Sequence, residues 1–289
     1  MTSDDVIQGH SIDLLKALHI LTRDGKINQD SRRKLKQVTH LFRFIEPMLK
    51  ELAQSHPAFR IVDMGAGKSY LGFILMDLFL RDHAPEACVI GIDTRQDLVD
   101  RSEALAKAMN LKGMAFLNLS AGDALISPSL PSHVDMVTAL HACNTATDDA
   151  IRFGLQKHAR YLVLVPCCQA EVAANLRRLK SQHKQDPLSE IWRHPLHTRE
   201  FGSQLTNALR CLQLEAHGYQ VTVTELVGWE HSMKNELILA ERKGPPQKRS
   251  ALRLLEILDR LGLDALRERF FVPAQFTSGA APSSTGAPS

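Results

Sequence analysis

A glycine turn follows the first strongly apolar run of this 289-residue chain and leads straight into a helical pattern. The stretch reads Arg60-Ile-Val-Asp-Met-Gly-Ala-Gly-Lys-Ser-Tyr-Leu71, and a second apolar run, Val89-Ile-Gly-Ile-Asp93, ends on a carboxylate. Glycines at a strand-to-helix turn let the backbone approach a ligand closely. A carboxylate that closes the next strand is placed to accept hydrogen bonds from ribose hydroxyls. The two stretches predict a doubly wound sheet that binds a nucleoside-containing cofactor.

Two common phosphate-binding motifs fit this turn poorly. Gly67-Lys-Ser imitates the end of a P-loop, but that motif needs another glycine five residues earlier, where the chain has Val62. The dinucleotide fingerprint needs a third glycine where the chain has Tyr70. Neither a phosphate cradle nor a dinucleotide site is therefore expected.

The spacing Asp63-x-Gly65-x-Gly67 resembles the first motif of the S-adenosylmethionine-dependent methyltransferases, with Ser69 in place of their last glycine. This resemblance implies S-adenosyl-L-methionine as the cofactor. Asp93 is expected to accept from its ribose.

Composition indicates a soluble globular protein. Apolar residues make up 44% of the chain and charged residues 23%, which are ordinary values for such proteins. No apolar run is long enough to span a bilayer, and the first residues lack the pattern of a signal peptide. Five cysteines, two of them adjacent, do not suggest a disulfide framework. We therefore expect a cytoplasmic protein with reduced thiols and no membrane partner.

The order of strands and helices predicts the fold class. Apolar runs indicate strands at 60–64, 88–92, 114–118, 134–139, 160–165, 219–227 and 236–241. Helical patterns, such as 70–81 and 98–109, separate the first five, which is typical of a parallel sheet covered on both faces. The last two runs are close enough to pair as an antiparallel hairpin. The prediction is an α/β Rossmann-like methyltransferase fold with seven strands.

Four segments are expected along the chain. They are an N-terminal helical extension at 1–55, a methyltransferase domain at 56–244, an amphipathic C-terminal helix within 245–271, and a disordered tail at 272–289. Helically spaced leucines predict the two helical segments. The tail is rich in Ala, Ser, Gly and Pro and has no charged side chain. The extension also contains the basic run Arg32-Arg-Lys-Leu-Lys36.

Polar and reactive residues follow several predicted strands at the carboxyl edge of the sheet, where doubly wound proteins bind their ligands. His141-Ala-Cys-Asn-Thr-Ala-Thr-Asp148 follows the fourth strand, and Cys167-Cys168 the fifth. This pair of motifs resembles a methyltransferase-like family that includes the tRNA 2′-O-methyltransferases. The resemblance covers about residues 35–241. It implies that RNA is the partner.

The resemblance also implies two groups of site residues. The cofactor site would comprise Asp63, Gly65, Ala66, Gly67, Asp93, Asp123 and His141. The acceptor site would comprise His141, Cys143, Asp148, Cys167 and Cys168.

The chemistry of the acceptor site leaves alternatives open. By residue type His141 is the best general base, because its unperturbed pKa lies close to neutrality. Asp148 would orient it, contact the substrate, or start a helix. A cysteine thiolate would instead serve carbon methylation, although free cysteines are most often small buried residues. We expect no metal, since His-x-Cys and adjacent cysteines do not match the usual zinc spacings.

Two classes of function remain open from the sequence. The first is a methyltransferase that acts on RNA or, as an alternative, on a protein or a small molecule. The second is an inactive binding or interaction protein that keeps the fold. The glycine turn together with Asp93 and Asp123 favours the first.

Overall fold

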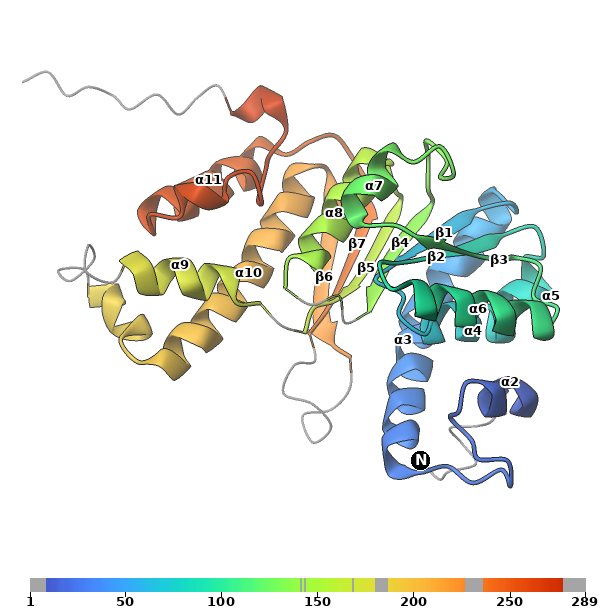
Figure 1. The fold of residues 1–289 in the computed structure, drawn as a ribbon. Helices are drawn as coiled ribbons and strands as arrows, with labels where there is room; N and C mark the ends of the chain where they lie inside the picture. The colour runs from blue at the N-terminus through green and yellow to red at the C-terminus, as the bar shows by residue number, and fades with distance from the viewer. Residues whose placement is uncertain are drawn as a thin grey trace, which may run out of the picture. The chain divides into compact units, whose positions relative to one another are not determined.

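A seven-stranded sheet forms the centre of the computed structural model (Figure 1). The structure describes residues 9–140, 142, 144–167, 169–179, 187–226 and 236–277. The strand order is β3-β2-β1-β4-β5-β7-β6. The strands are β1 (Arg60–Met64), β2 (Cys88–Asp93), β3 (Met114–Asn118), β4 (Met136–Leu140), β5 (Tyr161–Val165), β6 (Tyr219–Glu225) and β7 (Glu236–Arg242). The predicted Rossmann-like methyltransferase fold is confirmed, and each predicted strand is found within two residues of its expected bounds.

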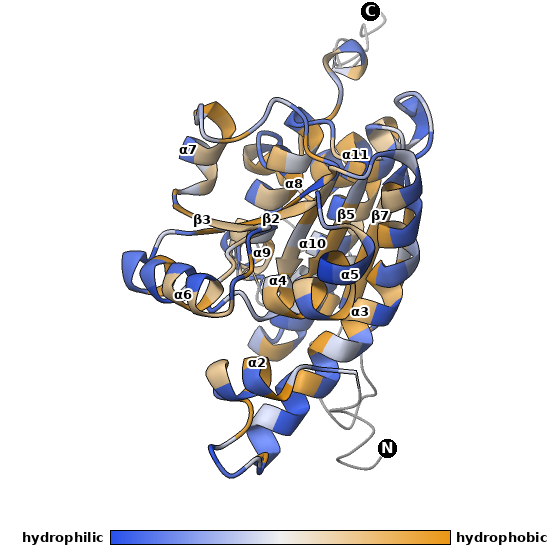
Figure 2. Cartoon of the chain, turned by 90° about the vertical axis from the view of Figure 1, so that its right-hand side faces the viewer, coloured by the Kyte–Doolittle hydropathy of each residue, from blue (hydrophilic) through white to orange (hydrophobic). Residues whose placement is uncertain are grey.

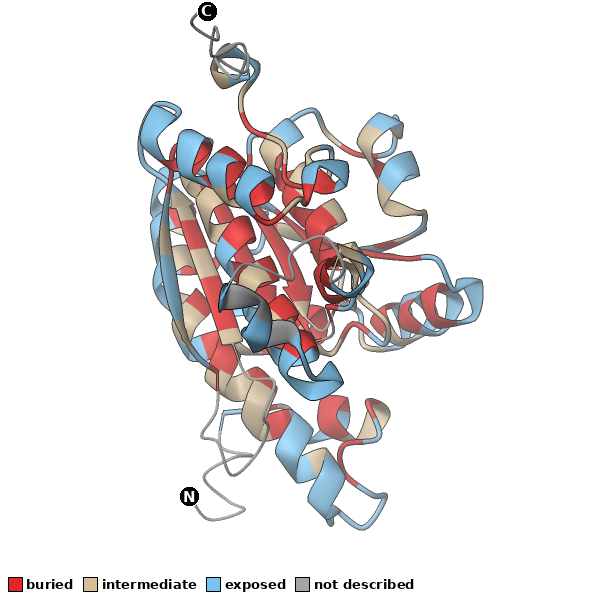
Figure 3. Cartoon of the chain, turned by 90° about the vertical axis from the view of Figure 1, so that its left-hand side faces the viewer, coloured by how far each residue is buried: buried red, intermediate tan, exposed pale blue. Residues whose placement is uncertain are grey.

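Strands β1 to β5 pair in parallel, and β7 pairs antiparallel with β5. Every residue of β5 is buried, whereas most residues of the edge strands β3 and β6 are partly or fully exposed. Figure 3 shows the central strands as mostly buried. This difference explains why the central strands read as continuous apolar runs. The carboxyl ends of β1, β2 and β4 meet at one edge of the sheet.

Helices between the parallel strands cover the sheet. They are α4 (Tyr70–Leu75), α5 (Arg81–His83), α6 (Gln96–Ala108), α7 (Ala121–Ile126) and α8 (Ala146–Gln156). Hydrophobic strands lie between helices with hydrophilic outer faces (Figure 2). The predicted helix 70–81 contains a π-helical turn at Met76–Leu80. Inside this turn the buried Asp77 accepts a hydrogen bond from the Ser11 amide at 2.8 Å, a contact that helical periodicity does not predict.

The N-terminal segment packs into the same core as the sheet. It consists of α2 (Ile12–Ala17) and the long amphipathic α3 (Gln29–Ser55). The Asn28 side chain caps α3 by accepting from the Ser31 amide at 2.7 Å. Leucines of α2 and α3 share one buried cluster with β1 and α4. The predicted helical extension is therefore continuous with the sheet's core.

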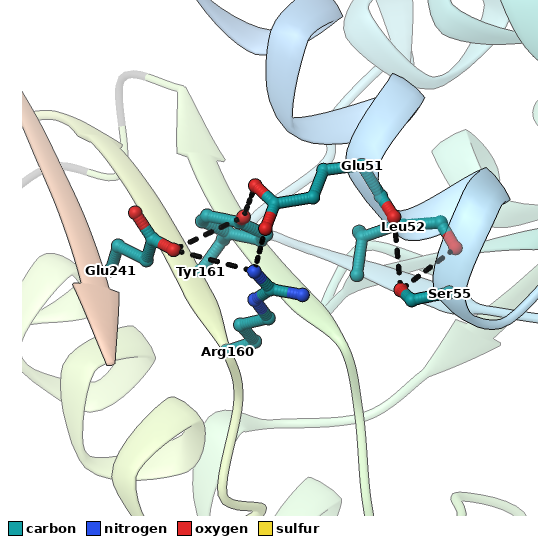
Figure 4. A network of polar contacts seen from close by, with 6 residues as sticks. All are labelled: Glu51, Leu52, Ser55, Arg160, Tyr161 and Glu241. Carbon is teal, nitrogen blue, oxygen red and sulfur yellow. Dashed lines mark hydrogen bonds and ion pairs between the residues drawn. The ribbon is translucent and has the colours of Figure 1, made fainter. Parts of the chain in front are cut away.

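A polar network ties the end of α3 to β5 and β7 (Figure 4). The Tyr161 hydroxyl donates to Glu51 Oε2 at 2.6 Å. The Arg160 guanidinium bonds to Glu51 and lies 3.4 Å from Glu241 Oε1. Burial raises the pKa of Tyr161, and its hydrogen bond to Glu51 raises it further, which keeps the phenol protonated as a donor.

The chain divides into two compact units. The first contains residues 1–168 and 222–241, and the second contains residues 169–221 and 242–289. The second unit is built from α9 (Glu171–Leu179), the 3₁₀ turn Pro187–Trp192, α10 (Pro195–Ala216) and α11 (Lys248–Arg260). These helices have an apolar core of their own.

The C-terminal helix ends earlier than its leucine pattern predicted. It stops at Arg260, and Gly262 follows with a φ of 65°. The Leu263 amide then donates to the Leu258 carbonyl at 2.7 Å, and the Gly262 amide donates to the Asp259 carbonyl at 3.0 Å. These two bonds form a Schellman motif, which ends a helix at a glycine.

After this cap, leucines that were predicted to continue the helix instead pack into the apolar core of the second unit. The first residues of the predicted disordered tail are folded, since Val272 is buried and Ala274–Phe276 form a 3₁₀ turn. Residues 278–289 of that tail lie outside the described residues.

Candidate functional site

The glycine turn lies at the carboxyl end of β1 and has the backbone that a close approach requires. Gly65 and Gly67 have φ values of 68° and 59°, in the left-handed region that glycine adopts without strain. The Ala66 amide donates to the Ile92 carbonyl at 3.0 Å and fixes the turn against the end of β2. The predicted turn residues are therefore brought together at the sheet edge.

Ser69, where the family motif has its last glycine, also has a positive φ, of 51°. It is fully buried, and its hydroxyl has no hydrogen-bond partner among the described residues. A left-handed conformation favours glycine over serine. Ser69 thus replaces the glycine of the motif at a position whose backbone conformation still favours glycine.

Asp93 closes β2 and holds the glycine turn. Its Oδ2 accepts from the Gly67 amide at 2.8 Å and from Arg95 Nη2 at 3.1 Å. Its Oδ1 accepts from the amide and the Nε of Arg95, both at 3.0 Å. A carboxylate has about four acceptor positions, so Arg95 and Gly67 together use all of them.

The charge of Asp93 is stabilised by these bonds. Burial alone would raise the pKa of Asp93, but the hydrogen bonds from Arg95 and Gly67 outweigh it, and the pKa is lowered. The Asp93 side chain is 7% exposed, whereas the Arg95 side chain is 61% exposed. Ribose hydroxyls that donate to Asp93 would therefore replace the hydrogen bonds from the exposed Arg95 guanidinium. The bond from the Gly67 amide would stay in place.

Asp63 lies inside β1, opposite Thr138 of β4. Its Oδ1 accepts from the Thr138 hydroxyl at 2.6 Å, and the residue is 2% exposed. Burial raises the pKa of Asp63 to about 7; the Thr138 bond opposes this rise and the charge of Asp93 adds to it. Asp63 is therefore a buried carboxyl group of β1 with a pKa near neutrality.

Asp123 lies in the first turn of α7. The Ser120 hydroxyl caps this helix by accepting from the Asp123 amide at 3.1 Å, and it donates to Asp123 Oδ2 at 2.6 Å. The Asp123 side chain is otherwise exposed. Its predicted place beside the adenine stays a prediction. Nearer to the turn, Asn118 Nδ2 at the end of β3 donates to the Asp93 carbonyl at 3.1 Å.

The segment after β4 runs beside the glycine turn. A methyl group added at Gly65 would lie 3.8 Å from the Ala142 Cβ. The Thr147 hydroxyl donates to the Ala142 carbonyl at 2.6 Å, which holds the segment against the start of α8. Asp148 is buried in the first turn of that helix.

Several predicted acceptor-site residues are not described. His141, Cys143 and Cys168 lie outside the described residues, and Cys167 is half-buried after β5. Their roles stay predictions. Within the described part of the chain, no group of three or more His, Cys, Asp or Glu residues is arranged to hold a metal ion. The expectation of no metal also stays a prediction, because three of the residues in question are outside that part.

Three residues with direct contacts in the site were not predicted. Arg95 was detectable from its position two residues after Asp93. Thr138 and Asn118 had no local pattern, because their partners lie 75 and 25 residues away in the chain.

Residues 33–175 match a family model described as a methyltransferase domain. Over this span, about half of its length, the chain is similar to a methyltransferase domain. The matched span includes the glycine turn, Asp93 and the segment after β4. The match agrees with the prediction of a methyltransferase at the level of this domain.

Two curated relatives are each named "Glutathione S-transferase C-terminal domain-containing protein", from Bos taurus and Mus musculus. Each is 24% identical, over 242 and 236 residues, and each alignment covers 75% of this chain and 34% of the relative. The chain thus spans about a third of the length of these relatives.

Two solved structures are similar in fold. The Podospora anserina methyltransferase PaMTH1 with bound S-adenosylhomocysteine is 12% identical, with a TM-score of 0.47, over 84% of this chain and 92% of that one. Aeropyrum pernix fibrillarin with bound S-adenosyl-L-methionine is 13% identical, with a TM-score of 0.39, over 63% of this chain and 66% of that one. The fold assignment rests on the strand order of this chain itself.

Among the described residues, no helix combines the length and the apolar character that a membrane span requires.

Proposed function

We propose that this chain is an active S-adenosylmethionine-dependent methyltransferase that acts on RNA in the cytoplasm. The observation that carries the proposal is the bond from the Gly67 amide to Asp93 at the carboxyl edge of β1 and β2. It joins a glycine turn open to close approach with a carboxylate held in its ionised form. That pairing suits a nucleoside, and it lies within the matched methyltransferase domain.

The residues present fit the cofactor. Gly65 and Gly67 have no Cβ atoms, and their positive φ values give the turn a backbone that glycine adopts without strain. Asp93 offers the ribose two oxygens, and its partner Arg95 is exposed enough to move aside. When bound, S-adenosylmethionine supplies an activated methyl group, so the protein has to orient the acceptor, exclude water and take up a proton.

RNA is proposed as the acceptor on two grounds. The His-x-Cys and Cys-Cys motifs resemble those of the tRNA 2′-O-methyltransferases, and the N-terminal segment contains an excess of positive charge. A hydroxyl acceptor must lose a proton as its oxygen bonds to the methyl carbon, and His141 is proposed to accept that proton. The position of Ala142 beside Gly65 supports this role for its neighbour. Asp148 is proposed to orient the base.

The cofactor part of the proposal is tested by isothermal titration of the purified protein with S-adenosylhomocysteine. Saturable binding is expected. Replacing Asp93 by Ala should weaken it by about 1.5–3 kcal/mol, the worth of hydrogen bonds to a charged group. An inactive binding protein with this fold need not bind the cofactor, so absence of binding would reject the enzymatic proposal.

The chemical part is tested by transfer of a labelled methyl group to RNA. His141→Ala should lower turnover by about 10²–10⁴-fold, as loss of a general base does, while cofactor binding is kept. Cys143→Ser tests the thiolate alternative, and it should lower turnover only modestly if the cysteine just shapes the pocket. Abolition of turnover in the cysteine variant, with His141→Ala unaffected, would point to a thiolate nucleophile instead. Transfer to protein but not to RNA would reject the substrate class.

A further inference from the structure

Positive charge is concentrated in one part of the N-terminal segment. Between residues 9 and 45 there are eight Lys and Arg residues and three Asp, with no Glu. The whole chain has a formal charge of +3, so the remainder of the chain is net negative. A local excess of this kind is the electrostatic footprint of a surface that binds a polyanion.

The structure separates this charge from the apolar side of the same segment. Six of these cations are exposed. We call the first five of them the basic face: Arg23, Lys26, Arg32, Arg33 and Lys34. The apolar residues of α3 are turned into the core, with Leu35 and Leu41 each 1% exposed. The first half of α3 and α2 project beyond the strands in Figure 1.

Little within the described segment neutralises the basic face. The Arg33–Asp30 pair is 3.8 Å long, and its side chains are 60% and 85% exposed. Exposed pairs of this kind contribute little. Farther along α3, the pKa of His40 is lowered, first by burial and then by the charges of Arg43 and Lys36. Arg43 and Lys36 thus add positive charge beside His40.

The N-terminal segment also borders a cavity next to the glycine turn. The cavity has a volume of about 300 Å³. Leu18 and His19 line it from the N-terminal segment, Lys68 and Tyr70 from the glycine turn and α4, and Arg101 from α6. Lys68 directly follows Gly67, so the rim of this cavity is cationic next to the proposed cofactor site. The Tyr70 hydroxyl donates to the Leu18 carbonyl at 3.4 Å and links the two parts.

We propose that the basic face binds the sugar–phosphate backbone of the RNA substrate and leads it towards the glycine turn. This inference rests on the proposed function, because it takes RNA as the substrate. RNA is favoured over an anionic membrane because a helix that lies on a bilayer must offer its apolar face to the lipid. In α3 that face is buried in the core.

The test compares two triple variants of the full chain. Arg32→Gln/Arg33→Gln/Lys34→Gln removes three charges of the basic face. The matched control, Lys248→Gln/Arg249→Gln/Arg253→Gln, removes three exposed charges from α11. Glutamine keeps a helix propensity similar to that of lysine and arginine. Binding of a labelled single-stranded RNA is measured by fluorescence anisotropy over a range of salt concentrations, and S-adenosylhomocysteine binding is measured on the same samples.

The basic-face variant should bind RNA roughly 10–100-fold more weakly at about 0.1 M salt. The slope of log affinity against log salt should fall by about 0.7 for each phosphate that the variant no longer neutralises, or about 2 for three phosphates. The α11 variant should bind as the parent does. Equal weakening in both variants, or weakening confined to the α11 variant, would overturn the inference.

Two further measurements separate the outcomes. Unchanged S-adenosylhomocysteine binding in the basic-face variant shows that its fold is intact. Tighter binding to vesicles of phosphatidylserine and phosphatidylcholine than to RNA would overturn the inference in favour of a membrane. RNA binding that depends on the basic face, without methyl transfer to RNA, would reject the proposed function and leave this surface standing.

Discussion

The buried carboxyl group of Asp63 predicts an unusual dependence of stability on pH. Its pKa is raised from 3.8 to about 7, mainly by burial. Between these two values the folded state retains a proton that the unfolded state has lost. Stability rises with pH only where the unfolded state binds more protons. The contribution of Asp63 therefore has the opposite sign: it is fully present below about pH 4 and is lost as the pH rises to about 7.

Replacing Asp63 by Asn removes this titration. The amide oxygen still accepts the Thr138 hydroxyl, which donates to Oδ1 at 2.6 Å in the parent. One pKa unit corresponds to about 1.36 kcal/mol, so a shift of roughly three units is worth on the order of 4 kcal/mol. Relative to the parent, the free energy of unfolding of the variant should change little at about pH 4 and should gain on the order of 4 kcal/mol above about pH 7.

The assay is urea unfolding followed by circular dichroism at several pH values between about 4 and 8. Asp24→Asn is the matched control, because Asp24 is exposed in a turn and its replacement should leave the pH dependence as it is. Parallel pH profiles for the parent and Asp63→Asn would refute the reasoning, since they would mean that Asp63 is ionised in the folded protein throughout this range.

Three other changes test separate contacts. Arg95→Ala frees acceptor positions on Asp93 and should tighten S-adenosylhomocysteine binding by up to about fivefold, the worth of an exposed ion pair; weaker binding on titration calorimetry would show that Arg95 holds the cofactor instead. Glu51→Ala removes the 2.6 Å acceptor of the Tyr161 hydroxyl and should cost about 1–3 kcal/mol in urea unfolding; costs that simply add to those of Tyr161→Phe in a double-mutant cycle would contradict the bond. Deleting residues 278–289, which contain neither charged nor large apolar side chains, should leave the melting temperature unchanged by calorimetry, and a drop of several degrees would show that they pack.

Local patterns were sufficient to predict the strands. The central strands are short, buried on both faces and separated by amphipathic helices, so their apolar runs stand out in the sequence. The glycine turn and the carboxylate of Asp93 were predictable for the same reason, since each follows its strand directly.

Helix ends were predicted less well, because they depend on particular caps. Helix α6 starts at Gln96, before the expected helical pattern 98–109. Helix α11 ends at Arg260, just before the cap at Gly262, although the helix was expected within 245–271. Periodicity describes which face of a helix is apolar. It does not say where the chain turns that face back onto the same core.

What the sequence determined by itself is the order of elements, the methyltransferase fold and the group of residues at one sheet edge. The contacts among these residues, in contrast, depend on how the chain packs. Thr138 meets Asp63 through the register of two strands that lie far apart in the sequence. The buried surroundings of Asp63 then set its charge, and the guanidinium of Arg95 fills the acceptor positions of Asp93. Sequence patterns record the preferences of neighbouring residues, whereas register, desolvation and the pairing of charges arise only when distant segments pack together.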